Sequence, residues 1–264
     1  GYNKPYMTQF GIFLRDIVTK FDWGISDKLF FGQDVVQIFT QRLPATVIVN
    51  LYSILFSIPI GIGLGVFAAL KKNTWVDYLI STLTMVVISV PSFVYAFIIQ
   101  YLFSYKLGWL PFLMKSGTDW FSPSMFVSML PAVMALGFGT IAGFTRTTRA
   151  ELTEVLTSDY MLLARTKGLT KAQAISRHAM RNAMVVILPM IIGEFIGILG
   201  GSMIIEQIFS IPGVGQLYIK SIRLFDYDVF MMDGIFYTFI GLLAGIVVDI
   251  SYGFIDPRIR MGEK

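Results

Sequence analysis

The chain has 264 residues, of which 55% are hydrophobic and 14% are charged, and its formal net charge is +4. Soluble domains carry about 25% charged residues, so this composition excludes an ordinary soluble domain and indicates a membrane protein. Cysteine is absent, which excludes disulfides and thiolate metal sites within this sequence.

The first 43 residues contain no apolar run long enough to cross a bilayer. Within them, Tyr6–Lys20 and Gln33–Gln41 have weak amphipathic spacing, which is typical of segments that lie on a membrane surface. The first residue is Gly, and no signal-peptide pattern is present. We therefore expect residues 1–43 to be an extramembrane segment.

Five apolar runs follow, and each exceeds the ~20 residues needed to span ~30 Å of hydrocarbon. Their expected bounds are Pro44–Leu70, Tyr78–Ser104, Ser124–Thr145, Ala183–Ile205 and Met231–Ile255. The pattern predicts an all-α membrane protein with five spans. Prolines interrupt four of the runs and are expected to kink them, at Pro59, Pro91, Pro131 and Pro189. Glycines in two of the runs are expected to permit close helix packing: Gly61, Gly63, Gly65, Gly193, Gly197, Gly200 and Gly201.

A polar, basic segment separates the third and fourth runs; we call this segment, Asp159–Asn182, the island. Its first helix, expected over Tyr160–Lys167, should end at Gly168, because glycine readily takes the left-handed conformation that ends helices. Thr170 should open a second helix, since Gln173 at the third position completes a capping box. Both helices have an apolar side, which favours docking to a partner protein.

The distribution of Lys and Arg predicts which ends of the spans face the cytoplasm, where basic residues concentrate. The side that holds the island carries more of them than the other side, whose largest group is spread over residues 1–43. We therefore expect the island and the C-terminus in the cytoplasm and residues 1–43 outside. With a cytoplasmic C-terminus, five spans place residue 1 on the outer side of the membrane. This placement favours a further helix upstream of this sequence.

No catalytic constellation is predicted. The single histidine, His178, excludes zinc sites built on paired histidines, and the Walker A pattern does not occur. A DNA-reading role for the island is disfavoured because both of its ends are tethered to membrane spans. We expect no cofactor, no metal and no nucleic-acid partner, and any energy input must come from another source.

Glu194 lies within the fourth run, where a carboxylate is costly and usually faces a bundle interior or a water-filled path. Two interpretations stay open. Glu194 lines a translocation path or meets a cationic group of a substrate; alternatively, it forms a hydrogen bond with a neighbouring helix or lies nearer a membrane interface than these bounds indicate. Asp249 is expected to be an interfacial or packing residue.

Three blocks of residues carry a family resemblance. The island contains Asp159-Tyr160, Ala164–Leu169 and Arg177–Ala183, and later stretches are Ile205-Glu206-x-x-Phe209-x-x-Pro212-Gly213-x-Gly215 and Asp256-Pro257-Arg258-Ile259-Arg260. Together they resemble the inner-membrane permeases of binding-protein-dependent ABC importers, and specifically the first permease of the dipeptide/oligopeptide type. The island resembles the EAA loop of this family. Leu162 and Leu163 replace the Glu and Ala of the general pattern, a departure that looks typical of the peptide subgroup.

The resemblance implies a type I ABC importer transmembrane fold with six spans, the first of them missing here. It implies a transmembrane domain over 44–260 with a coupling loop at 146–182 and a cytoplasmic tail at 261–264, in a bacterial inner membrane. The implied partners are a second homologous permease, two cytoplasmic ATP-binding subunits, an extracytoplasmic substrate-binding protein and membrane lipid. The chain itself would be noncatalytic. The residues implied in coupling to the ATPase are Asp159, Tyr160, Leu163, Ala164, Arg165, Lys167, Gly168, Leu169, His178 and Arg181.

A second hypothesis belongs to another class of transporter. The chain could be a self-contained secondary carrier driven by protons, with Glu194 as the proton-binding carboxylate. Such a carrier would be active when purified alone, whereas copurifying ATPase subunits would exclude it. The absence of a detectable inverted repeat weighs against this alternative.

Overall fold

The fold is that of a computed structural model, which describes residues 3–255. The motif Asp256–Arg260 and the tail 261–264 lie outside the described residues. The regular secondary structure of the described part is helical apart from one isolated β-bridge between Ile25 and Asp34.

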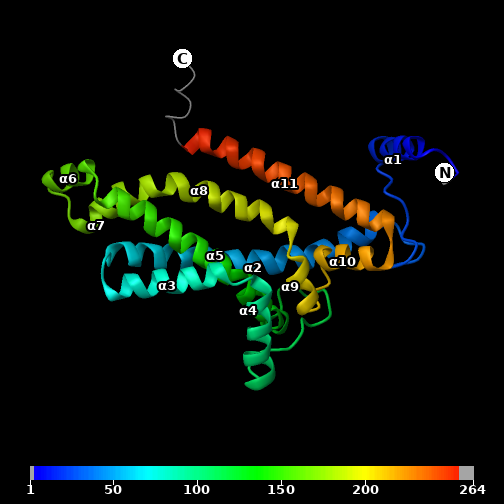
Figure 1. The fold of residues 1–264 in the computed structure, drawn as a ribbon, viewed down its shortest axis with the longest axis horizontal. Coiled ribbons are helices and arrows are strands. Elements are labelled where there is room, and N and C mark those ends of the chain that lie inside the picture. Colours follow the sequence, from blue (N-terminus) through cyan, green and yellow to red (C-terminus); the bar gives the residue numbers. More distant parts are fainter. Residues whose placement is uncertain (1–2, 256–264) are drawn as a thin grey trace, which may run out of the picture.

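Four helical segments in the described range are long and apolar enough to cross a membrane. They are α2 (Val35–Leu70), α5 (Pro123–Leu156), the segment Lys171–Gly200 and α11 (Tyr227–Ile255). Figure 1 shows them running roughly along one axis, and α5 contacts both α2 and α8, which in turn contacts α11. These four correspond to the first, third, fourth and fifth predicted spans.

The second predicted span is broken rather than kinked. Helix α3 (Trp75–Ser89) is followed by α4 (Ser92–Ile99) and a π-helical extension to Lys106, and the two parts meet at 101°. In Figure 1, α4 points away from the bundle. Val90 has an extended backbone (φ −104°, ψ 129°), as expected for a residue whose helical conformation clashes with the following proline, here Pro91. The prolines of the other runs stay inside continuous helices.

Two spans extend further into the island's end of the molecule than the apolar pattern predicts. Helix α5 continues past Thr145 to Leu156. The fourth span begins at Lys171, where α7 (Lys171–Ala174) leads through a π-helical turn (Ile175–Ala179) into α8 (Met180–Gly197) and a 3₁₀ turn ending at Gly200. The second helix of the island is therefore the first part of a span, because nothing between Lys171 and Gly200 breaks the helix.

Close packing of α2 on α5 depends on two glycines. A Cβ atom on Gly61 would lie 2.8 Å from the Cβ of Phe144, and one on Gly65 would lie 2.6 Å from the Cβ of Thr148. Because any larger side chain would push the helices apart, the predicted packing role is confirmed for these two glycines. Gly63 differs, since no atom lies within 4 Å of its Cβ position.

The remaining helices gather at the two ends of the bundle (Figure 1). Helix α6 (Asp159–Thr166) lies with α7 at one end. Helices α1 (Tyr6–Lys20) and α10 (Val214–Leu224) lie toward the other end, with α9 (Met203–Ile208) connecting the fourth span to α10.

The N-terminal segment is attached to the connection between α10 and α11 through one buried carboxylate. Asp226 Oδ2 accepts hydrogen bonds from the Ser26 hydroxyl at 2.6 Å and from the backbone N–H groups of Leu29 at 2.9 Å and Lys28 at 3.1 Å. Burial acts to raise the pKa of Asp226, but these hydrogen bonds outweigh it and hold that pKa below its ordinary value. The segment is thus fastened to the same end of the spans as α10.

Candidate functional site

The island has the helix–turn–helix geometry that the sequence predicts. Gly168 has a φ of +86°, so it adopts the left-handed conformation that reverses the chain after α6. The capping box at Thr170 is also confirmed: the Gln173 N–H donates to Thr170 Oγ1 at 3.3 Å, and the Thr170 N–H donates to Gln173 Oε1 at 3.1 Å.

One side of the island packs against the spans. Met161, Ala164 and Ala174 are buried in a cluster with side chains from α2, α5 and α8. Ala164 is only 6% exposed, so it stabilises the island instead of offering a docking contact. The Asn182 side-chain amide donates a hydrogen bond of 2.5 Å to the Tyr160 hydroxyl, which joins α6 to α8. The island is therefore fixed to the bundle.

The other side of the island is open. Leu162 and Leu163 are 63% and 55% exposed, although leucine prefers burial. Most of the residues predicted to couple to an ATPase are also exposed: Asp159, Tyr160, Lys167, Gly168, His178 and Arg181. Leu169 is half-buried, and the side chain of Arg165 lies outside the described part of the structure. The outer surface thus combines two leucines with basic side chains, a composition suited to contact with a protein.

A charged pair that sequence reasoning missed braces the bundle beside the island. Arg149 of α5 binds Asp77 of α3 through two contacts, from Nε to Oδ1 at 2.5 Å and from Nη2 to Oδ2 at 2.8 Å. The Asp77 side chain is fully buried and also accepts the N–H of Asn73 at 3.0 Å. This arrangement ties the turn between α2 and α3 to the last turns of α5, just before the island. The only sequence signal was an acidic residue at the start of an apolar run.

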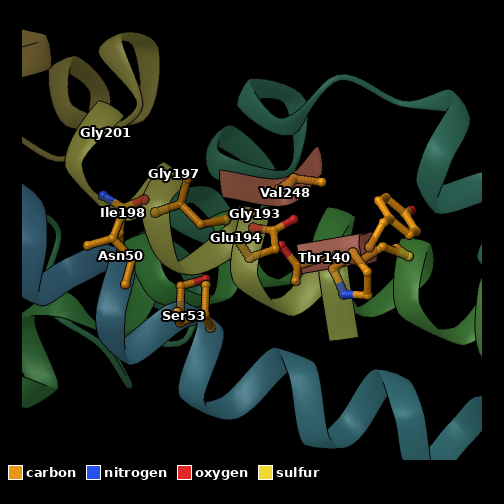
Figure 2. A pocket seen from close by; sticks show the side chains of 14 residues that line it. Asn50, Ser53, Thr140, Gly193, Glu194, Gly197, Ile198, Gly201 and Val248 are labelled. Atoms are coloured by element: carbon orange, nitrogen blue, oxygen red, sulfur yellow. The ribbon is translucent and has the colours of Figure 1, made fainter. Parts of the chain in front are cut away.

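A second feature lies between the spans. A cavity of about 600 Å³ is lined by α2, α5, α8 and α11. Figure 2 shows the Glu194 side chain from α8 near its centre, with Thr140 and Val248 beside it and Asn50 and Ser53 across from it. Cavities of this size are typical of small-molecule sites.

The Glu194 carboxylate has neither a hydrogen bond nor an ion pair with any described residue. The alternative that it bonds a neighbouring helix therefore finds no support in this structure. The glycines around it take two roles: Gly193 faces Val248 of α11 at 3.4 Å from its Cβ position, whereas Gly197 has no atom within 4 Å. Gly197 thus leaves space on the cavity side of α8, where packing was predicted.

The connection after the fourth span contains a buried carboxylate, Glu206 of α9, which belongs to one of the blocks that carry the family resemblance. Glu206, which is 2% exposed, accepts the Thr46 hydroxyl on Oε1 and the Gln216 N–H on Oε2, both at 2.8 Å. Cβ atoms on Gly201 and Gly213 would lie 2.6 Å and 2.5 Å from these oxygens, so both positions need glycine. Glu206 therefore fastens α9 to α2 and to the first turn of α10, whose dipole favours a negative charge. A glutamate next to a Pro-Gly-x-Gly turn is the signal that could have found it.

Comparison with known sequences gives concordant matches. Residues 61–261 match the protein family described as binding-protein-dependent transport system inner membrane component. The dipeptide transport system permease protein DppB of Bacillus subtilis is 35% identical over 263 residues, which cover 99% of this chain and 82% of that protein. The oligopeptide transport system permease protein OppB of Haemophilus influenzae is 31% identical over 258 residues, 98% of this chain and 82% of that protein.

Solved structures show the same fold. The crystal structure of an amino acid ABC transporter with histidines matches with a TM-score of 0.58 and 21% identity, over 81% of this chain and 92% of that one. The methionine ABC transporter MetNI in an inward-facing conformation matches with a TM-score of 0.60 and 14% identity, over 82% of this chain and 97% of that one. The fold is therefore that of ABC importer transmembrane subunits.

Proposed function

Since the chain belongs to the binding-protein-dependent transport system inner membrane component family, we propose that it is the permease subunit of an ATP-driven peptide importer. As a multi-pass ABC permease it would form half of a translocation path and contribute no catalytic residue. ATP would be hydrolysed by two separate ATP-binding subunits. The other half of the path would come from a second homologous permease.

The observation that carries the coupling role is the outer surface of the island. Leu162 and Leu163 remain exposed on a helix pair that is otherwise packed against the spans. An exposed apolar helix surface of this kind suits a groove on another protein. We assign that groove to the ATP-binding subunits, which places the island and the C-terminus in the cytoplasm. The opposite end, with residues 3–34 and α10, would face the extracytoplasmic substrate-binding protein of a bacterial cell membrane.

Peptides are proposed as the substrate class because of the names of the relatives. Permeases named for dipeptide and oligopeptide transport match along nearly the whole chain. The exposed leucine pair at positions 162 and 163 in the island supports the same assignment, because it departs from the general EAA pattern as the peptide subgroup does.

Replacement of Gly168 tests the coupling role. An L-residue in the left-handed region costs roughly 1–2 kcal/mol, and Gly168→Val should therefore distort the turn between α6 and α7 without preventing membrane insertion. Gly63→Val is a matched control, because Gly63 lies in α2 with open space at its Cβ position and no positive φ.

The measurement is peptide uptake and ATP hydrolysis by the importer assembled in proteoliposomes. We expect Gly168→Val to lower uptake about tenfold or more, the effect of about 1.4 kcal/mol, while the variant still reaches the membrane. Gly63→Val should transport normally. Unchanged uptake by Gly168→Val would contradict the coupling role.

A further inference from the structure

We propose that Glu194 is the counter-charge for the ammonium group of the transported substrate, and that the cavity around it is a transient binding site on the translocation path. This inference rests on the proposed function, since it needs a substrate that passes between the spans. It adds a residue, a location and a chemical group to that function.

The position of the cavity supports a site on a path. Its wall is made by four membrane helices, and Glu194 projects into it from α8 (Figure 2). Gly193 and Gly197 lie one residue before and three residues after Glu194. Because neither has a side chain, the surface of α8 beside Glu194 does not protrude into the cavity. A volume of about 600 Å³ accommodates a small peptide.

The charge of the lining favours a cation. Among the described residues that line the cavity, Glu194 is the single charged side chain, and it has no ion-pair partner. A carboxylate at this depth is costly unless it is compensated, and positive charge is attracted to a cleft of negative sign. A cationic group of a passing substrate would supply the positive charge beside Glu194 that the protein itself does not.

The lining also selects the kind of cation. Calcium takes six to eight oxygen ligands and magnesium requires an octahedral shell, so one carboxylate is a poor site for either. An ammonium group instead donates three hydrogen bonds. Besides Glu194, acceptors in the lining are provided by the hydroxyls of Ser53 and Thr140 and the amide of Asn50. Peptides with a free amino terminus carry such a group.

The test compares variants of the complete importer, reconstituted with its binding protein and ATP-binding subunits, using radiolabelled dialanine. Glu194→Gln keeps the size of the side chain but removes its charge, and Glu194→Asp keeps the charge. Asp249→Asn is the matched control, because Asp249 is an exposed acid of α11 outside the cavity lining.

We expect Glu194→Gln to lower dialanine uptake about tenfold or more, in line with a hydrogen bond between charged groups. Glu194→Asp should retain much of the uptake, and Asp249→Asn should match the wild type. Equal uptake by Glu194→Gln and wild type would overturn the inference, as would equal losses in Glu194→Gln and Glu194→Asp. An assembled wild-type complex that moves no peptide would instead overturn the proposed function.

A thiol measurement covers the case in which Glu194→Gln fails to assemble. The chain has no cysteine, so Val248→Cys, in the cavity lining beside Glu194 (Figure 2), introduces the only thiol of this chain and keeps the carboxylate. Dialanine, delivered by the binding protein in the presence of ATP, should slow the modification of this thiol. An unchanged modification rate would overturn the inference.

Discussion

Asp77 and Arg149 lie 72 positions apart in the sequence but form a bidentate ion pair beside the island. The Asp77 side chain is fully buried, and that of Arg149 is 31% exposed. Removing one partner of a buried pair is more harmful than removing both, because the remaining charge stays desolvated without compensation.

Breaking this pair should lower the stability of the protein. Arg149→Met should destabilise the protein by up to about 3–5 kcal/mol, the cost of an orphaned buried charge, with partial exposure of Arg149 reducing it. The double variant Asp77→Asn/Arg149→Met should recover part of the loss. Thermal unfolding in detergent measures both effects.

Arg146→Met is the control for this comparison, because Arg146 is exposed on α5 and makes no ion pair with a described residue. It should unfold within about 1 °C of the wild type, as expected for surface substitutions. A double variant less stable than Arg149→Met would contradict the assignment of the pair.

For single residues, the sequence predicts which positions shape the structure better than it predicts which residues they contact. Gly168 and Thr170 were identified because turn and cap signals are local and depend on residues three positions apart. The pairing of Arg149 with Asp77 and of Thr46 with Glu206 depends on tertiary packing between helices distant in sequence. No spacing rule connects such residues.

Among the helices, the prolines show that sequence patterns do not predict whether a helix breaks. Hydropathy predicted all five apolar runs, yet Pro91 breaks its helix by 101° whereas Pro59 stays within α2. Helix α2 is held on both sides of Pro59 by close contact with α5, in which Gly61 and Gly65 take part. The outcome at each proline therefore depends on neighbours that a single run does not reveal.

The glycines of α2 allow a controlled test of helix packing. Gly61→Val should destabilise the α2–α5 contact, because even its Cβ atom would lie 2.9 Å from the Ile141 carbonyl oxygen. Overpacking of this kind typically costs about 1–3 kcal/mol. The same substitution at Gly63, two positions away with open space, should cost less than about 1 kcal/mol.

Thermal unfolding of the two glycine variants in the same detergent checks this expectation. Gly65→Val should resemble Gly61→Val, since its Cβ would lie 2.8 Å from the Thr145 carbonyl oxygen. Equal stabilities of the variants at positions 61 and 63 would show that α2 and α5 do not pack as described.

The two ends of the molecule differ in structure. One end holds the island, with exposed leucines and basic side chains, and the other holds α1, α10 and the segment anchored by Asp226 (Figure 1). The excess of Lys and Arg at the first end predicts that it faces the cytoplasm. The family and the fold agree with the resemblance found in the sequence.

Single cysteines test this orientation directly, since the chain contains none. Ser176 and Asp27 are exposed at opposite ends of the spans. In intact cells, a membrane-impermeant maleimide should label Asp27→Cys, whereas Ser176→Cys should react after permeabilisation alone. The unsubstituted chain serves as the control, and the opposite labelling pattern would reverse the proposed orientation.

The helix is continuous from Lys171 to Gly200, so a tilt at one end would displace the side chains at the other. At 1.5 Å per residue, Glu194 lies about 35 Å along this helix from Lys171. A tilt of about 5° about the island's end would carry the carboxylate roughly 3 Å sideways, which is the length of a hydrogen bond. A rigid tilt that begins at the island could thus break the contact between Glu194 and the ammonium group of a passing substrate. No local rearrangement around Glu194 would be needed.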